Sequence, residues 1–187
     1  MNTHSDFLNK ISELQHNYYA NNKKNILFKE KQKQDCALSI TRQLSLNELL
    51  EHSIFILPNS YKIFIDYKLF KTFAEPSINN SILQHIMNLT IYCINTYNTY
   101  EVHIDLSGFT ISSAQRYKSM IQLYNASCLQ SDTRFSAILK IMHVYNVPTI
   151  IDNIATILNP FIDNTVKTKI ILHSKSESPG LLALLLQ

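Results

Sequence analysis

The stretch Glu101-Val-His-Ile-Asp-Leu-Ser-Gly108 decides the fold class, because it has the pattern of a buried strand that ends in a glycine turn. Ser112 follows it as the expected cap of a helix whose apolar residues recur at helical spacing. Two further strand patterns lie at 138–146 and 169–173, and the first stops at Pro148, which cannot donate a hydrogen bond to a sheet. Strands that alternate with helices in this way predict an α/β fold with a mostly parallel sheet covered by helices.

Residues upstream of this stretch add two strands to the expected sheet. The patterns at 53–57 and 61–66 flank Pro58-Asn-Ser60, which is typical of two strands joined by a turn. A long helical pattern after Pro76 ends near Asn98 and leads into the next strand. The sheet is therefore expected to contain about five strands.

The two ends of the chain differ from this core. Residues 1–52 are expected to form a short helical segment in which 21–35 is a basic linker. Residues 53–187 are expected to form the α/β domain, and its last stretch, 178–187, is expected to be a docked helix.

Composition argues against several classes of protein. The chain has two glycines, too few for the glycine-rich loops whose backbone amides approach nucleotide phosphates. The net charge is only +3, and nucleic-acid binding normally requires a stronger basic face, so no nucleic-acid partner is expected. The three cysteines are widely spaced, so a zinc site or a disulfide framework is not expected and a reducing compartment fits.

We expect a cytoplasmic protein, soluble or peripheral to a membrane. Charged residues interrupt 1–25, which therefore lacks the apolar core of a signal peptide. No run of the sequence reaches the about 18 apolar residues of a membrane span. The abundance of Asn, Ile, Lys and Tyr is typical of an AT-rich genome and is compatible with a viral or parasitic origin.

Residues that often carry chemistry are present, but they lack the partners that catalysis needs. His103, His143 and His173 lie on three expected strands and can meet as metal ligands, although satisfied histidines at a sheet are favoured. Asp105 stands where ligand sites of α/β folds lie, without an adjacent acid, base or nucleophile. Ser112 lacks the strained Gly-x-Ser-x-Gly turn of a nucleophile. We therefore expect no enzyme, no cofactor and no metal, and a small hydrolase is the least favoured interpretation.

Four stretches between about 61 and 182 carry a family resemblance. They are Val102-His-Ile-Asp-Leu-Ser-Gly108, His143-Val-Tyr-Asn-Val-Pro148, Asn159-Pro-Phe-Ile-Asp163 and Lys169-Ile-Ile-Leu-His173. Their order and spacing resemble the CRAL-TRIO domain, the family of cellular retinaldehyde-binding, tocopherol-transfer and phosphatidylinositol-transfer proteins. The second stretch is similar to the family's strand ending in Asn-Ala-Pro, the third to its Lys-Pro-Phe-Leu-Asp and the fourth to its final strand.

The resemblance implies a pocket for one lipid, gated by the helical segment 149–163. Six apolar residues of this segment are the implied ligand contacts: Ile150, Ile151, Ile154, Ile157, Leu158 and Phe161. Their spacing is equally typical of a helix packed on a sheet.

Two basic residues are the implied headgroup contacts. Lys169 matches the lysine that phosphoinositide-binding members use at the headgroup. Arg134 lies in Asp132-Thr-Arg-Phe135, where the family usually has Pro-Glu-Arg-Leu, so Thr133 stands in place of the glutamate.

Two functions remain open. One is non-catalytic binding or transfer of a lipid or another hydrophobic ligand, with transient membrane contact. The alternative is a protein-interaction or structural module without a pocket on the same fold, which meets a protein partner or a second copy of itself, in a viral or other assembly. Ile104-Asp-Leu-Ser-Gly108 also resembles the STAS domains, whose fold fits the downstream stretches poorly.

Overall fold

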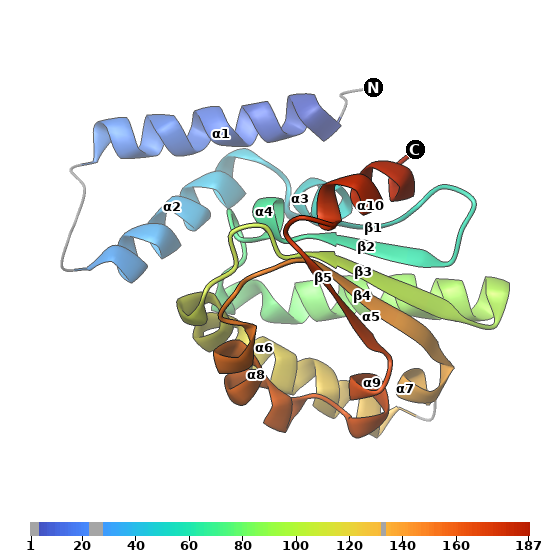
Figure 1. Ribbon diagram of the computed structural model, residues 1–187. Coiled ribbons are helices and arrows are strands. Elements are labelled where there is room, and N and C mark those ends of the chain that lie inside the picture. The colour runs from blue at the N-terminus through green and yellow to red at the C-terminus, as the bar shows by residue number, and fades with distance from the viewer. Residues whose placement is uncertain (1–3, 23–27, 132–133) are drawn as a thin grey trace.

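The computed structural model describes residues 4–22, 28–131 and 134–187 and has an α/β fold built on a five-stranded sheet (Figure 1). The strands are β1 (Ile54–Ile56), β2 (Lys62–Asp66), β3 (Tyr100–Asp105), β4 (Leu139–Val147) and β5 (Ile170–Ser174). They lie in chain order across the sheet; β1 is antiparallel to β2, and the remaining neighbours are parallel. The prediction of a mostly parallel sheet is confirmed.

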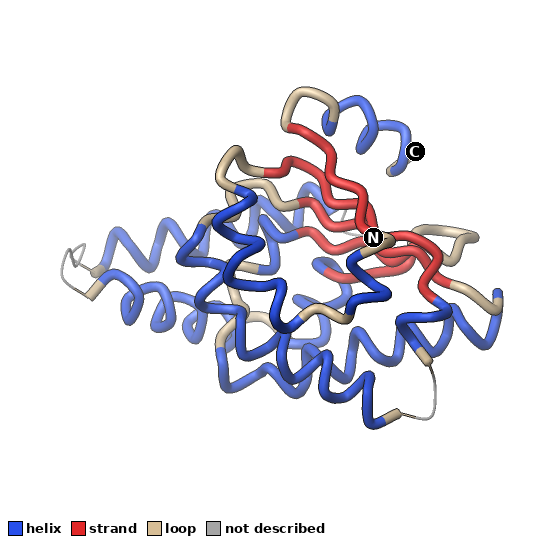
Figure 2. The backbone as a smooth tube through the Cα atoms, turned by 60° about the horizontal axis from the view of Figure 1, so that its bottom comes forward, coloured by secondary structure: helices blue, strands red, loops and turns tan. Residues whose placement is uncertain are grey.

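The connecting helices gather on one face of this sheet. They are α4 (Tyr67–Phe70), η1 (Pro76–Ile78), α5 (Asn79–Tyr97), α6 (Ile111–Gln130), α7 (Phe135–Ile138), α8 (Ile151–Leu158), η2 (Asn159–Phe161) and α9 (Asn164–Lys167). Crossovers between parallel strands are right-handed, and here each one steps in the same direction, so α5, α6 and α8 cover the same face. Figures 1 and 2 show these helices on one side of the sheet, which we call the helical face.

The opposite face, which we call the outer face, carries α10 (Ser178–Leu185), and the expected docked C-terminal helix is confirmed (Figures 1 and 2). The two faces differ because successive side chains of a strand point to opposite sides. Ile63 pairs with Val102 on the helical face, whereas Lys62 pairs with Glu101 on the outer face. The helical face is therefore aliphatic, whereas the outer face mixes polar residues with apolar ones such as Phe64 and Ile171.

The turn after β3 depends on a glycine and on a threonine cap. Gly108 has a φ of +77°, and a Cβ atom there would lie 2.9 Å from Lys71 Nζ. The N-cap of α6 is Thr110, whose hydroxyl accepts a hydrogen bond from the backbone N–H of Ser113 at 3.2 Å. The prediction that Ser112 caps this helix is wrong, because the helix begins at Ile111 and Ser112 lies within its first turn.

Three helices precede the sheet: α1 (His4–Asn21), α2 (Lys29–Gln43) and α3 (Leu46–Ser53). The predicted linker over 21–35 is wrong from Lys29 onward, because α2 starts there, while 23–27 lies outside the described residues. Lysine and glutamine are good helix formers, and the helix is held by Cys36 and Ile40, which are 2% and 1% exposed.

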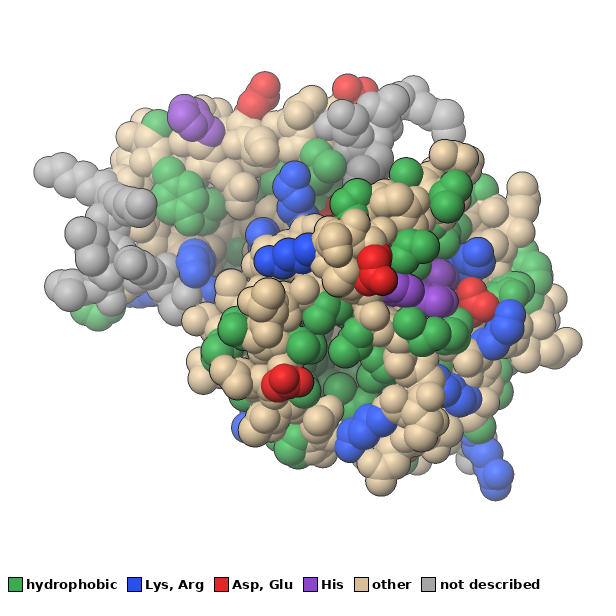
Figure 3. Space-filling model, viewed as in Figure 1, with side chains coloured by type: hydrophobic (Ala, Val, Ile, Leu, Met, Phe, Trp, Pro, Cys, Tyr) green, Lys and Arg blue, Asp and Glu red, His purple; other side chains and the backbone are tan. Residues whose placement is uncertain are grey.

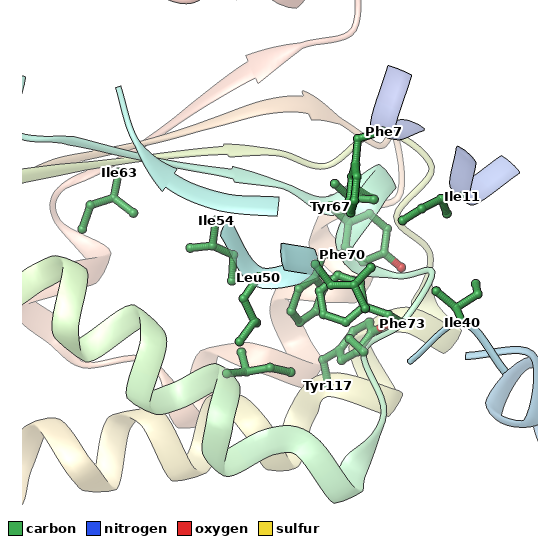
Figure 4. Close-up of a cluster of buried hydrophobic side chains, with 14 of the residues drawn as sticks. Phe7, Ile11, Ile40, Leu50, Ile54, Ile63, Tyr67, Phe70, Phe73 and Tyr117 are labelled. Atoms are coloured by element: carbon green, nitrogen blue, oxygen red, sulfur yellow. The ribbon is translucent and has the colours of Figure 1, made fainter. Parts of the chain in front are cut away.

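One hydrophobic core joins these N-terminal helices to the sheet (Figure 4). Phe7 and Ile11 of α1 belong to the same cluster of buried side chains as Phe73 and Ile63 of the α/β domain. The Phe7 ring stacks on His52 of α3 with 4.0 Å between centroids. The N-terminal helices therefore pack as part of this core.

We predict that Phe7→Ala lowers the free energy of unfolding by about 3–5 kcal/mol, because Phe7 is 0% exposed and its removal leaves a cavity. Chemical denaturation followed by circular dichroism measures the change. Leu129→Ala is the control, because Leu129 is 69% exposed and its truncation should change stability by less than about 0.5 kcal/mol. Equal stability of the two variants would contradict a shared core.

Candidate functional site

The segment predicted to gate a lipid pocket packs on α6. Both α8 and η2 contact α6, and Lys118 Nζ of α6 lies 4.9 Å from the centroid of the Phe161 ring. Ile154 is 2% exposed, whereas Ile150 is 40% exposed. The other predicted ligand contacts are half-buried: Ile151, Ile157, Leu158 and Phe161. The segment therefore has a packed side and a side that reaches solvent.

Apolar surface is left open on the helical face at β5. Leu172 pairs with Val144 of β4 on this face, yet Leu172 is 51% exposed and Val144 only 8%. The helices thus cover the sheet up to β4 and leave its last strand partly open, with Ile170 half-buried and Leu172 exposed. We call Ile170 and Leu172, the helical-face residues of β5, the β5 edge. Figure 3 shows hydrophobic side chains around a recess on this side of the molecule.

Two buried tyrosines lie between the sheet and α6. Tyr100 of β3 is 3% exposed, and its hydroxyl donates a hydrogen bond to the Phe135 carbonyl at 3.0 Å. Tyr117 of α6 is 5% exposed. The residues 149–163 line neither the hollow at the outer face nor the one at Ser12 and His16 of α1. Open apolar surface lies at the β5 edge, where Leu172 is exposed.

The two predicted headgroup residues stand at opposite ends of α7. Arg134 occupies the N-cap position and is exposed. The Lys169 ammonium donates hydrogen bonds to the carbonyls of Ser136 at 2.8 Å and Ala137 at 2.9 Å, and to that of Leu139. Carbonyls at a helix end lack intrahelical partners, so Lys169 serves as a cap for α7. Asp132 and Thr133 lie outside the described residues.

The outer face brings the three predicted histidines together. His103, His143 and His173 come from β3, β4 and β5, and their rings stack with centroids 4.9 Å and 5.2 Å apart. Tyr145 of β4 joins them, with its ring 4.8 Å from that of His173. Nδ1 of His143 lies 2.9 Å from Nε2 of His173, so one ring donates a hydrogen bond to the other. We call these four residues the histidine array.

A carboxylate sets the protonation of His103. Its Nε2 lies 3.4 Å from Glu101 Oε2, too long for a strong hydrogen bond, so the carboxylate acts on it mainly by charge. This charge favours the proton on Nε2, so that Nδ1 accepts from the Tyr145 hydroxyl at 2.9 Å. Burial nevertheless lowers the pKa of His103 to about 4. Burial opposes ionisation of Glu101, but the hydrogen bond from Lys140 holds its pKa below the usual value.

A hollow of about 270 Å³ lies between the histidine array and α10. Its lining adds one basic residue and three leucines to the array: Lys62, Leu181, Leu184 and Leu185. Figure 3 shows histidine side chains at the surface, among hydrophobic, acidic and basic neighbours. We call this hollow the outer cleft.

A polar network ties α10 to the ends of β3 and β4. Asp105 Oδ1 accepts hydrogen bonds from Ser107 and from the side-chain amide of Asn146, the latter at 2.7 Å. The Asn146 backbone N–H donates to Ser178 Oγ at 2.7 Å, and Ser178 is 0% exposed. Asn146 has a φ of 53°, a left-handed conformation that asparagine tolerates. Asp105 is therefore held in structural hydrogen bonds.

Sequence reasoning missed Lys62, Tyr145 and the leucines of the outer cleft. The signal was the period-two alternation of polar and apolar residues in Glu101-Val-His and His143-Val-Tyr, which puts the polar residues on one face. Which strands lie side by side depends on the strand order, which the sequence pattern does not give.

Among the described residues, no group of three or more histidine, cysteine, aspartate or glutamate side chains is placed to hold a metal ion. Within the same part of the chain, no helix combines the length and hydrophobicity that crossing a membrane requires.

A family model described as "CRAL/TRIO domain" matches residues 59–185. The match spans more than half of the chain, and the chain belongs to this family of lipid-binding domains. The predicted resemblance is thereby confirmed.

Solved structures give the same fold, with 18 matching chains. One of them, "Crystal structure of Sfh5", is 12% identical and matches with a TM-score of 0.54 over 89% of this chain and 68% of that one. At this identity the likeness shows the fold alone. No curated protein sequence matches the chain.

We predict that Lys169→Met lowers the free energy of unfolding by about 1–3 kcal/mol, because the carbonyls at the end of α7 lose their charged donor. Urea denaturation measures the change. Lys167→Met is the matched control: Lys167 Nζ donates to the exposed Asn164 side chain, so a change within about 0.5 kcal/mol is expected. A loss no larger than the control's would remove the capping role.

Proposed function

We propose that this domain binds one hydrophobic ligand, a lipid in the first instance, without catalysis, and that α8 and the β5 edge hold its hydrocarbon chain. The observation that carries the proposal is the exposure of Leu172 beside the covered Val144, in a chain of a lipid-binding family. Exposed apolar surface gains free energy when a hydrocarbon chain covers it, at roughly 25 cal/mol per Å².

The gating role falls to α8 in this proposal. It packs on α6 and buries Ile154, while Ile150, Ile151 and Leu158 are exposed or half-buried. A ligand chain lies along the β5 edge or displaces α8 from α6, on which α8 packs. Movement of α8 would then expose further apolar surface and favour transient contact with a membrane.

Arg134 is the proposed headgroup contact. It is exposed, and its side chain makes no hydrogen bond or ion pair within the described residues. Lys169 sits at the other end of α7, and it can reach a headgroup only by giving up the carbonyls that it caps. An anionic lipid would therefore be held by one guanidinium, which binds phosphate oxygens in a bidentate way.

A second function, protein interaction, is favoured by α10. Two leucines of this helix and the leucine that follows it are exposed: Leu181 by 38%, Leu184 by 72% and Leu186 by 52%. Clustered apolar side chains of this kind are typical of surfaces that a protein partner covers. A stable oligomer that carries no lipid would support this function over the first.

Native mass spectrometry with lipid extraction tests the lipid proposal. We expect the purified protein to carry one lipid per chain and Leu172→Glu to lower its occupancy at least about tenfold, because a carboxylate opposes an apolar chain. Leu129→Glu, on the exposed end of α6, is the control and should keep the lipid. A lipid-free protein in all three forms would rule the proposal out.

Arg134→Ala tests the headgroup contact. With vesicles that differ only in anionic lipid content, the substitution should weaken uptake of the anionic lipid about three- to tenfold, since a charge-assisted hydrogen bond is lost. Uptake of a neutral lipid should stay the same. Unchanged uptake of both lipids removes Arg134 from the site.

A further inference from the structure

The outer cleft has a polar floor and an apolar roof. The sheet supplies the histidine array and Lys62 from below, and Leu181, Leu184 and Leu185 of α10 lie above. A molecule that fills such a cleft must be polar at one end and apolar at the other, because buried polar groups need partners and leucines do not. The cleft is on the outer face, so the sheet separates it from the β5 edge.

Lys62 gives the floor a cation that is not neutralised. Its strand neighbour on the outer face is Glu101, but Glu101 Oε1 is taken by Lys140 at 3.0 Å and Oε2 faces His103. Within the described residues the Lys62 side chain has no hydrogen bond and no ion pair, although it is half-buried. An anion placed in the cleft would meet this ammonium directly.

The groups around the array leave the floor positive or neutral. Charged and titratable side chains face it from four strands: Lys62 of β2, Glu101 and His103 of β3, Lys140, His143 and Tyr145 of β4, and His173 of β5. The helix α10 contributes none, since Ser178–Leu185 carries no ionisable side chain. Glu177 precedes it, and its carboxylate accepts from Ser174 at 2.6 Å.

We propose that the outer cleft binds a small amphipathic carboxylate, with the anion on Lys62 and the His143–His173 pair and the apolar body under the leucines of α10. The volume of about 270 Å³ falls just below the range of pockets for drug-sized ligands, so a short hydrocarbon body fits. A single negative charge fits better than two, because Lys62 is the single lysine or arginine in the described lining of the cleft.

We expect His143 to take up a proton when the carboxylate binds. Burial, and then the neighbouring His173, lower the pKa of His143, so this ring is neutral near pH 7 in the empty cleft. A bound carboxylate favours the charged ring and raises that pKa, so the complex takes up a proton. Affinity should therefore rise as the pH falls from 7.0 toward 5.5, where an aliphatic carboxylate is still mostly ionised.

Titration calorimetry of the purified chain with octanoate tests the proposal. We expect one octanoate per chain, at least about tenfold tighter binding than octanol, and at least about threefold tighter binding at pH 5.5 than at pH 7.0. Lys62→Met should weaken octanoate binding about tenfold, which corresponds to about 1.4 kcal/mol. Lys68→Met, an exposed lysine of α4, should leave it unchanged.

A second variant separates this site from the proposed lipid site. Leu172→Glu lies on the other face of the sheet and should leave octanoate binding intact, whatever its effect on bound lipid. Octanoate binding that is lost in Leu172→Glu but kept in Lys62→Met would place the molecule at the β5 edge and overturn the proposal. No octanoate binding, or octanol that binds as tightly as octanoate, would overturn it too. Thermal unfolding of Lys62→Met confirms that the variant is folded.

Discussion

The handedness of the parallel crossovers is the constraint on which the architecture depends. Because β2, β3, β4 and β5 follow one another in the same direction, right-handed connections put α5, α6 and α8 on one face. That face has to be aliphatic to hold the helices, and the pleat then assigns the alternate residues to the other side. The apolar helical face, and the collection of the polar strand residues on the outer face, follow from one topological rule.

The same rule explains how much of the fold the sequence predicts. Strands rich in Val and Ile, the glycine at 108 and the proline at 148 predict the sheet and its turns, and the structure confirms them. The prediction fails where local chemistry is ambiguous. Lys29 begins a helix in a stretch whose composition predicts a linker, since lysine and glutamine are common in both. The cap of α6 is predicted at Ser112 instead of Thr110 because three hydroxyl residues lie within four positions, and each of them can cap a helix.

The candidate sites depend on information that no single strand carries. The sequence puts His103, His143 and His173 on strands, but their contact requires strand order and register, which arise from pairing in three dimensions. Lys169 matches a family position by sequence, yet its role here is set by the end of α7, a helix that lies 30 residues or more away along the chain. Residue identity limits the chemistry that is possible, and the packing selects among the options.

The strand order of this sheet has a consequence for folding during synthesis on the ribosome. Each of β3, β4 and β5 pairs with the strand synthesised just before it, and only the helical connection between the two has to fold first. The sheet can therefore grow by adding strands at one edge. No early strand waits unpaired between two others for a late arrival. The last strand to be added is β5, so it forms the open edge of the finished sheet and exposes Leu172. The nascent domain would therefore present an apolar strand edge to any hydrocarbon chain nearby.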